Sequence, residues 1–377
     1  MEWKEVRLGD VCSIQRGASP RPIQKFISKE GMPWVKIADA TGISSRYISS
    51  TSEYIIKEGI SKSRIVHPGD LIVSNSATPG LPKFMAIEAC VHDGWLIIRD
   101  LDGIDKVFLY YVFINIRRRL SNQANGSVFM NLKTDIVKDF VIKLPTLDDQ
   151  RRIASILSSL DQKIELNNKI NADLEEMAQA IFKNWFVDFE PFKDGKFVDS
   201  ELGMIPEGWK VGCLGDLITI KYGKDHKKLE DGTFPVYGSG GFMRFVNSWL
   251  YDGESVLIPR KGTLDNIMYV CEKFWTVDTM FFSVPKMDYV MKYVYNYIKR
   301  FDFSKMNEGT SVPSNTAARL NKMPILIPTH EILEMYDETL CPIYNKRKMK
   351  DKESRILSTL RDTLLPRLMS GELEVPE

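Results

Sequence analysis

The chain has 377 residues, a length that suits two domains. Apolar residues make up 44% and charged residues 27% of it, so the chain can bury hydrophobic cores and is not disordered as a whole. Its 51 basic and 50 acidic residues nearly cancel, which means that a nucleic-acid partner has to be inferred from local charge rather than from net charge.

Metal sites, secretion and several common kinds of catalysis find no support in the sequence. The five cysteines lie far apart and the four histidines are not paired, so we expect reduced thiols and no metal site. There is no GxxxxGK[ST] phosphate loop, no strand-linked GxGxxG and no GxSxG. No apolar run is long enough for a membrane span, and MEWKEVRLGD lacks the apolar core of an export signal, so we expect a cytoplasmic protein without catalytic residues or a cofactor of its own.

Residues 1–147 form the first predicted domain, which combines short strands with one helix. The segment KVFLYYVFINIRRRLSNQ (106–123) predicts the helix. Runs rich in β-branched and aromatic residues predict strands at 34–38, 64–66, 70–74, 84–91 and 94–99.

Residues 148–187 predict a first long helix. Apolar residues recur alternately every four and every three positions for about five heptads, a period that is typical of a coiled coil. Asn167 and Asn171 stand at the polar centre of this stripe, where polar residues commonly fix the register of paired helices. The stripe consists of Ile153, Leu157, Leu160, Ile164, Asn167, Asn171, Leu174, Ala178, Ile181 and Trp185.

The second half of the chain follows the same plan. An ordered linker (188–208) leads to a second predicted domain (209–330), whose strands precede a helix at 289–300. Residues 331–377 predict a second long helix and a tail. Arg347 and Lys350 form the polar centre of its stripe, and Pro366 is expected to kink or end it.

The two halves are copies of one frame. WKEVRLGDVCSIQRG (3–17) aligns with WKVGCLGDLITIKYG (209–223) at an offset of 206, whereas PGDLIVSN (68–75) aligns with DGESVLIP (252–259) at an offset of 184. The first copy therefore carries about 22 additional residues between these segments. Two copies that share a frame and differ inside are typical of one scaffold with two recognition surfaces.

The sequence thus predicts an α+β protein with a pseudo-twofold internal repeat. Two similar, mixed, mostly β domains would each be followed by a long helix, and the two helices would pair antiparallel as a coiled coil. We expect Asn167, Asn171, Arg347 and Lys350 to fix the register of the helix pair.

Several segments have the order and spacing of a known family. They are the W-x-x-x-x-L-G-D openings at Trp3 and Trp209, PVYGSGG (235–241), VLIPRKGT (256–263), WTVDTMFF (275–282), PTLDDQRRIASILSSLDQKIELNN, NWFVDFEP and LLPRLMSGELEV. On these segments the whole chain resembles the specificity subunit of Type I restriction–modification systems.

The resemblance implies a DNA-recognition subunit with no chemistry of its own. Each domain would be a target recognition domain that reads one half of a bipartite, asymmetric site in double-stranded DNA. The helix pair would set the spacer and dock two methyltransferase subunits, to which restriction/translocase subunits are added. S-adenosylmethionine, ATP and Mg would be held by those partners, which methylate adenine and cut unmodified DNA.

Within that reading, phosphate contacts should supply affinity, and groups that reach base edges should supply specificity. We expect these groups in basic loops with interleaved tyrosines, and in glycine-rich turns where the backbone can approach phosphate closely. The candidates are Arg16, Arg21, Lys25, Lys36, Arg46, Ser74, Asn75, Ser76, Asn125, Ser127 and Asn131 in the first copy, and Lys221, Tyr222, Lys224, His226, Lys227, Lys228, Tyr237, Ser239, Gly240, Arg260, Lys261 and Thr263 in the second.

Two other hypotheses compete with this one. A stand-alone DNA-binding regulator or an anti-restriction decoy would use the same domains without partner enzymes, and co-purification with a methyltransferase separates it from a specificity subunit. A nuclease or methyltransferase would need catalytic motifs that the sequence lacks. Cleavage or methyl transfer by the purified chain alone would favour this second alternative.

Overall fold

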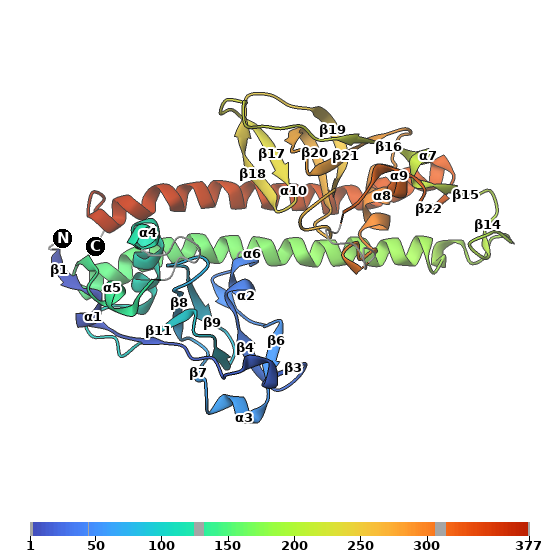
Figure 1. Ribbon diagram of the computed structural model, residues 1–377. Helices are drawn as coiled ribbons and strands as arrows, with labels where there is room; N and C mark the ends of the chain where they lie inside the picture. The colour runs from blue at the N-terminus through green and yellow to red at the C-terminus, as the bar shows by residue number, and fades with distance from the viewer. Residues whose placement is uncertain (1–2, 44, 124–131, 306–313, 376–377) are drawn as a thin grey trace. The chain divides into compact units, whose positions relative to one another are not determined.

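The computed structural model describes residues 3–375 except 44, 124–131 and 306–313. Contacts within the chain divide it into two compact units: unit 1 comprises Met1–Asn168 with Asp351–Glu377, and unit 2 comprises Lys169–Lys350. Two long helices, α6 (Leu147–Phe186) and α10 (His330–Ser370), each contribute one half to each unit (Figure 1). Among the described residues, no helix combines the length and apolar character that crossing a membrane requires.

Unit 1 contains two five-stranded sheets and a two-stranded ribbon. One sheet has the strand order β3-β6-β4-β10-β7, the other has the order β2-β11-β8-β9-β5, and β1 pairs with β12. Figure 1 shows β8, β9 and β11 side by side. The elements are β1 (Lys4–Arg7), α1 (Leu8–Val11), β2 (Ser13–Arg16), η1 (Ile23–Lys25), β3 (Ile27–Ser28), β4 (Met32–Val35), α2 (Ile37–Thr41), β5 (Tyr47–Ile48), β6 (Glu53–Ile55), α3 (Lys57–Ile60), β7 (Arg64–Val66), β8 (Leu71–Ser74), β9 (Pro82–Met85), β10 (Ala89–Val91), β11 (Trp95–Arg99), α4 (Lys106–Gln123), α5 (Thr134–Lys138) and β12 (Val141–Leu144).

Unit 2 is built on one six-stranded sheet with the strand order β16-β21-β19-β20-β17-β18, together with the ribbons β13-β14 and β15-β22. The elements are η2 (Glu190–Phe192), β13 (Phe197–Val198), β14 (Ile205–Pro206), β15 (Lys210–Cys213), α7 (Leu214–Leu217), β16 (Ile218–Tyr222), β17 (Phe234–Gly238), β18 (Gly241–Val246), β19 (Tyr251–Pro259), β20 (Met268–Thr276), β21 (Met280–Pro285), α8 (Met291–Ile298), α9 (Ala317–Asn321) and β22 (Pro324–Ile327).

The additional residues of the first copy build an additional sheet. Strands β3, β4 and β6 all lie in the segment between Gly17 and Pro68, and they form most of a sheet that has no counterpart in the described part of unit 2. Trp34, Ile55 and Cys90 form a small buried cluster beneath it. The inserted segment is therefore a folded layer with its own core, not an extended loop.

The repeated LGD segment is a packing device. In both copies it forms a one-turn helix, α1 or α7, whose leucine, Leu8 or Leu214, is completely buried. The following glycine lets a second short helix approach closely. A Cβ on Gly9 would lie 3.0 Å from the Cβ of Lys138, and a Cβ on Gly215 would lie 3.2 Å from the Cβ of Asn321. The motif thus helps to hold the domain together.

The predicted mixed α+β class is confirmed, and most strand pairs are antiparallel, with parallel pairs only locally, as between β4 and β10. Helix α4 spans the predicted residues 106–123. The predicted strand at 84–91 is wrong, because the chain turns within it and forms β9 in one sheet and β10 in the other. Pro366 does not end α10, since its missing N–H removes a single hydrogen bond close to the end of the helix, at Ser370.

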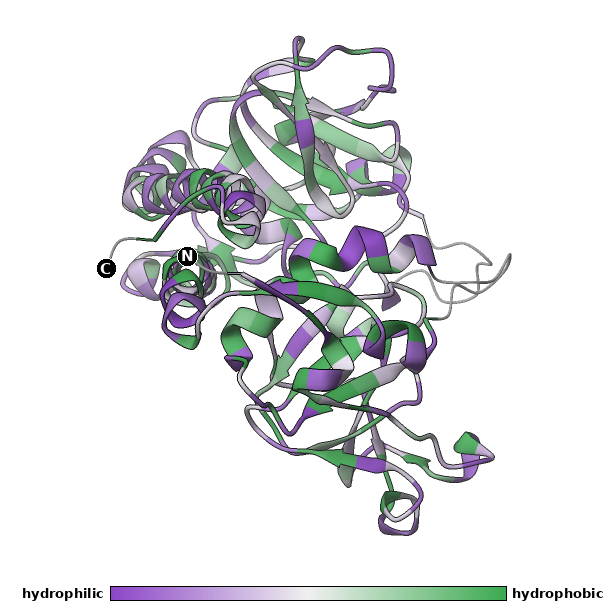
Figure 2. Ribbon diagram, turned by 90° about the vertical axis from the view of Figure 1, so that its left-hand side faces the viewer, coloured by the Kyte–Doolittle hydropathy of each residue, from purple (hydrophilic) through white to green (hydrophobic). Residues whose placement is uncertain are grey.

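The two long helices pack antiparallel within each unit. In unit 1, Asp161 of α6 meets Arg361 of α10, and Asn167 meets Ser354. In unit 2, the ring centroids of Phe182 and Tyr336 lie 6.4 Å apart. Figure 2 shows purple and green residues along both long helices, as expected for helices with one apolar stripe and one polar face.

Candidate nucleic-acid interface

In unit 2 the structure brings three of the predicted loops together. Arg260 lies over the ring of Tyr222, 5.8 Å from its centroid, and so joins the end of β19 to the end of β16. The turn between β17 and β18 packs on the same loop, because Asn266 Nδ2 donates a hydrogen bond to the Ser239 carbonyl oxygen at 2.9 Å. A Cβ on Gly262 would lie 2.5 Å from Ser239 Oγ, so close packing of the two loops requires this glycine, whose φ is +87°.

Apart from the ring of Tyr222, the side chains of these loops that face solvent are cationic or small. Lys221, Lys261 and Thr263 are exposed, Tyr222 is 55% exposed, and Gly240 has open space around it. No acidic side chain forms an ion pair with Lys221 or Lys261 among the described residues. The cluster Lys221–Tyr222–Ser239–Gly240–Arg260–Lys261–Thr263, hereafter the β16/β19 cluster, is thus an exposed basic surface with a tyrosine at its centre.

A second basic loop, residues 223–229, is tied to the neighbouring strand β18. Arg244 donates from Nη2 to the carbonyl oxygens of His226 and Leu229, both at 2.8 Å, and from Nε to His226 Nδ1 at 3.3 Å. Lys224, Lys227 and Lys228 point to solvent. The backbone N–H of Lys227 bonds to the exposed carboxylate of Asp225, and this bond holds the pKa of Asp225 below its ordinary value.

Tyr237 does not belong to the exposed surface, which corrects the sequence-based expectation. Its ring is 5% exposed, and its hydroxyl donates to Glu272 Oε1 at 2.7 Å. The ring lies in the core beneath the six-stranded sheet together with Phe274. The tyrosine therefore supports the neighbouring turn from below.

Sequence reasoning missed several residues of this surface. Arg244 and Asn266 position the loops, yet nothing in their local sequence distinguishes them. Four large apolar side chains on or next to β18 are unusually exposed, at 40–51%: Phe242, Met243, Phe245 and Trp249.

In unit 1 the candidate residues gather around a carboxylate that the sequence analysis did not select, Asp93. Arg16 Nε donates to the Asp93 carbonyl oxygen at 2.8 Å, Arg21 Nη2 lies 3.1 Å from Asp93 Oδ2, and Ser19 Oγ donates to Oδ1 at 2.7 Å. His92 Nε2 lies 3.2 Å from the same Oδ1. Asp93 therefore holds two exposed arginines at one place, Arg21 through its carboxylate and Arg16 mainly through its backbone carbonyl oxygen.

The pKa values around Asp93 follow from burial and charge. Partial burial alone would raise the pKa of Asp93, but the Ser19 hydrogen bond and the charges of His92, Arg21 and Arg16 outweigh it, so that the pKa lies below its ordinary value. Burial lowers the pKa of His92 below its ordinary value, although Asp93 opposes this shift. At neutral pH the Asp93 carboxylate is thus ionised and the His92 ring is neutral, beside the two cationic arginines.

Three further candidates of unit 1 are internal, and these expectations are wrong in their original form. Arg46 is 5% exposed and forms a two-pronged ion pair with Glu165, with Nε–Oε1 and Nη2–Oε2 distances of 3.0 Å. Ser74 Oγ accepts from Leu81 N, and Asn75 accepts from Leu132 N through its carbonyl oxygen at 2.7 Å. Both are buried, because strand β8 ends inside the domain.

The remaining candidates of unit 1 are scattered. Lys25 is exposed on η1, and Ser76 is half-buried beside Gly94. Lys36 is half-buried, with Nζ 2.6 Å from Glu53 Oε1. Asn125, Ser127 and Asn131 lie outside the described residues.

The four residues predicted to fix the helix register lie on the facing sides of the long helices. Asn167 is completely buried and donates to Ser354 Oγ at 3.3 Å. Asn171, Arg347 and Lys350 are half-buried, and Arg347 Nη1 lies 2.6 Å from Glu175 Oε2. The angle of that contact is outside hydrogen-bond geometry, so it is an ion pair.

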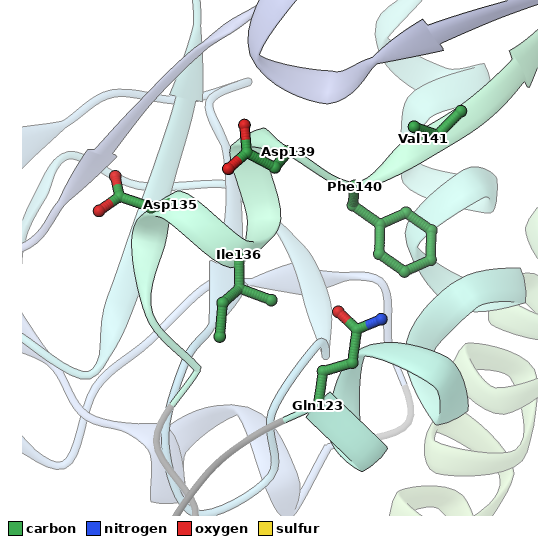
Figure 3. Close-up of a pocket in the computed structure, with 6 residues that line it drawn as sticks. All are labelled: Gln123, Asp135, Ile136, Asp139, Phe140 and Val141. Carbon is green, nitrogen blue, oxygen red and sulfur yellow. The ribbon is translucent and has the colours of Figure 1, made fainter.

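A cavity of about 480 Å³ in unit 1 lies beside α5 and is unsuited to nucleic acid. Figure 3 shows Asp135 and Asp139 at the two ends of α5, with Gln123 and the ring of Phe140 at the other side. Among the described residues, two carboxylates and no cation line the cavity, which disfavours phosphate. No group of three or more His, Cys, Asp or Glu side chains that could hold a metal ion occurs among the described residues.

Comparisons with known proteins agree with this architecture. A sequence relative from Methanocaldococcus jannaschii, the MjaIX specificity subunit of a Type I restriction enzyme, is 26% identical over all of this chain and 94% of its own length. The HindI specificity subunit of Haemophilus influenzae is 22% identical over 99% of this chain and 100% of its own length.

The crystal structure of a Type I restriction–modification S subunit from M. genitalium superposes on this chain with a TM-score of 0.56, at 18% identity, and covers 100% of this chain and 97% of the other. This likeness concerns the fold. Residues 1–176 and 206–361 match the family described as the Type I restriction modification DNA specificity domain. Because the match extends over both copies of the internal repeat, the chain belongs to that family.

Proposed function

We propose that this chain is the DNA sequence-recognition subunit of a Type I restriction–modification complex, in which each unit's domain reads one half of a bipartite, asymmetric site. The observation that carries the proposal is the family match over both repeats, combined with two domains whose frames agree and whose exposed loops differ. Two different domains on one frame suit a DNA site with two different halves.

In unit 2, the β16/β19 cluster is the proposed contact surface. Lys221, Arg260 and Lys261 would neutralise phosphates, which supplies affinity that depends on salt but not on sequence. The exposed Tyr222 offers a flat apolar ring and a hydroxyl next to these charges. The loop that carries Lys224, Lys227 and Lys228 would extend the same contact along the duplex.

In unit 1, Arg16 and Arg21 are the proposed contact residues. An arginine fork held by a carboxylate keeps a fixed direction, and guanine in the major groove is the base that a bidentate arginine reads best. Asp93 would orient the two side chains without contacting DNA itself. The unlike chemistry of the two units supports unlike half-sites.

The partners follow from the same proposal. Two methyltransferase subunits would dock on the helix pair and hold S-adenosylmethionine, and restriction subunits would hold ATP and Mg. The chain itself would contribute no catalytic group, and the complex would work in the cytoplasm, where the cell's DNA lies. The length of the helix pair would set the spacer between the half-sites.

Domain exchange tests the proposal. Residues 205–330 are replaced by the matching domain of a relative, the chimera is co-expressed with its methyltransferase subunit, and methylated adenines are mapped across the genome. One half-site should change while the other half-site stays the same. If no methylation depends on the chain, a stand-alone regulator or decoy is favoured instead, and if both halves change, the assignment of one domain to each half-site is wrong.

A second experiment tests the spacer. Four residues inserted after Asn168 add about 6 Å of helix, which corresponds to one or two base pairs of DNA at ~3.4 Å each. The methylated site should gain about that spacing with unchanged half-sites. An unchanged spacer in a folded, active variant would show that the helices dock the partner subunits but do not set the spacer.

A further inference from the structure

Unit 1 joins its domain to both long helices through one carboxylate. Tyr111 of α4 donates its hydroxyl hydrogen to Asp161 Oδ2 at 2.6 Å, and Arg361 Nη1 of α10 lies 2.6 Å from Asp161 Oδ1. The Asp161 side chain is 6% exposed and that of Arg361 is 28% exposed, so the ion pair is largely shielded from water.

Unit 2 contains the same three-part contact. Tyr295 of α8 donates to Glu175 Oε2 at 2.9 Å, and Arg347 Nη1 of α10 lies 2.6 Å from the same oxygen. Both charged side chains are 20% exposed. We call the two contacts Tyr111–Asp161–Arg361 and Tyr295–Glu175–Arg347 the clasps.

The clasps are spaced regularly along the helices. Asp161 and Glu175 are 14 residues apart on α6, and Arg347 and Arg361 are 14 residues apart on α10. Fourteen residues are two heptads, so the two charges of each helix lie on the same face. Residues 168 and 354 mark the midpoints, next to the contact between Asn167 and Ser354.

The tyrosines follow the internal repeat, but the charges do not. Tyr111 and Tyr295 are related by the repeat offset of 184. A strict repeat would place the acid on the helix that follows each domain, hence once on α6 and once on α10. Instead both acids lie on α6 and both arginines lie on α10.

We propose that the clasps select the pairing partner of each long helix: α6 accepts a helix of the α10 type and rejects a second copy of itself, and α10 does the same. In an antiparallel α6–α6 pair about the same midpoint, Asp161 would face Glu175 at both ends. In an α10–α10 pair, Arg347 would face Arg361 at both ends. Two like charges in sites this shielded from water oppose association, whereas the α6–α10 pair places opposite charges together twice.

If the proposed function holds, on which this step rests, the selective pairing of the long helices ensures that each subunit carries one copy of each domain. Pairing of two α6 helices would bring together two copies of the first domain and so create a symmetric DNA site. The ion pair Lys163–Glu353 has the opposite polarity, with its base on α6, but its side chains are 42% and 38% exposed, so it contributes little to the choice of partner.

The test uses the folded full-length chain with a protease site introduced into the exposed turn Glu201–Met204. The chain is cut there, unfolded in denaturant and refolded, and the pairs formed by its N-part and C-part are counted by native mass spectrometry. We expect the N·C pair to exceed the N·N and C·C pairs by about tenfold or more. A statistical mixture of the three would overturn the proposal.

One variant should reverse this preference. Glu175→Arg with Arg361→Glu makes each helix complementary to itself and gives the N·C pair like charges at both clasps. N·N and C·C pairs should then predominate. The matched control, Lys163→Glu with Glu353→Lys, exchanges an exposed pair on the same helices and should leave N·C predominant.

If the cut chain does not refold, a measurement on the uncut chain tests the same proposal. The uncut Glu175→Arg/Arg361→Glu chain should melt at a lower temperature than the parent and self-associate. A monomer of unchanged melting temperature would overturn the proposal. Neither readout involves DNA, so failure here is distinct from failure of the proposed DNA recognition.

Discussion

The guanidinium of Arg260 lies over the ring of Tyr222, and this contact joins two segments of unit 2 that are separated by the β17–β18 hairpin and the whole of β19. It fixes a cation beside an exposed aromatic ring at the centre of the β16/β19 cluster. The ammonium group of the neighbouring Lys261 forms no ion pair with the residues that the structure describes, so it can move to meet a phosphate.

Replacement of Lys261 by alanine should weaken DNA binding equally for specific and unrelated sequences. Each lost phosphate contact lowers the slope of log affinity against log salt by ~0.9. Fluorescence anisotropy at several salt concentrations measures this slope. Lys196→Ala, at an exposed position of the linker, is the matched control and should change neither quantity. Loss of affinity for the specific site alone would assign Lys261 to base recognition instead.

Alanine at Gly223 should destabilise unit 2 by about 1–3 kcal/mol, because there is no room for a side chain. A Cβ on Gly223 would lie 2.1 Å from the Val277 carbonyl oxygen. A Cβ on the equivalent residue of unit 1, Gly17, would lie 2.3 Å from the His92 carbonyl oxygen. Gly240→Ala is the control, since nothing lies within 4 Å of its Cβ position. Thermal unfolding of the parent and the two variants checks this ranking, and equal melting temperatures of the two variants would contradict it.

Arg46→Ala should lower the stability of unit 1 by about 3–5 kcal/mol, because it leaves Glu165 without its partner. The side chains are 6% and 25% exposed, so water replaces the lost contact poorly. Denaturant unfolding measures the loss. Since Arg46 does not reach the surface, the salt dependence of DNA binding by the remaining folded protein should equal that of the parent. A lower slope of log affinity against log salt would show that Arg46 contacts DNA after all.

Acidification should show how much the ionised carboxylate of Asp93 contributes to stability. Its folded-state pKa lies below the unfolded value, so the ionised carboxylate contributes stability that is complete above the unfolded pKa and is lost as the pH falls through the folded one. The melting temperature of the parent should therefore fall below about pH 4. Asp93→Asn should melt lower at neutral pH and show a shallower fall in that range. Asp102→Asn, at an exposed position of the same domain, should follow the parent curve.

His92 should also make the protein less stable as the pH falls, but in a higher pH range than Asp93. Its folded-state pKa is below the ordinary value of 6.5, so the folded state favours the neutral ring and stability begins to fall as the pH drops below that value. His92→Gln should remove this first part of the decline and keep the steeper part below about pH 4. A decline that is unchanged from pH 7 to 5 would contradict the assignment.

The parts of the fold that could be predicted are those with a local signature. The heptad stripe predicts α6 because its period is visible within 40 residues, and the repeated LGD segments align because both copies need the same close approach of two short helices. The heptad period does not predict which charged residues of the two long helices form ion pairs, because Asp161 and Arg361 are separated by 200 residues.

The candidate site was predicted less well, because exposure depends on distant partners. Arg46 resembles a surface arginine until Glu165, 119 residues further along, is known to meet it. Tyr237 resembles an interleaved aromatic until Glu272 binds its hydroxyl. Where the local sequence itself sets exposure, as in the basic run 223–229 held by an Asx turn at Asp225, the expected lysines do face solvent.

The order of the long helices along the chain has a consequence for synthesis on the ribosome. About 145 residues separate the end of α6 at Phe186 from the start of α10 at His330, so at about 5–20 residues per second the apolar stripe of α6 waits roughly 7–30 s for its partner. On a polysome, the nearest helices during that wait are copies of α6 on neighbouring nascent chains. Asp161 and Glu175 would then repel those copies before Arg347 and Arg361 have been translated, and so protect the nascent chain from pairing with its neighbours.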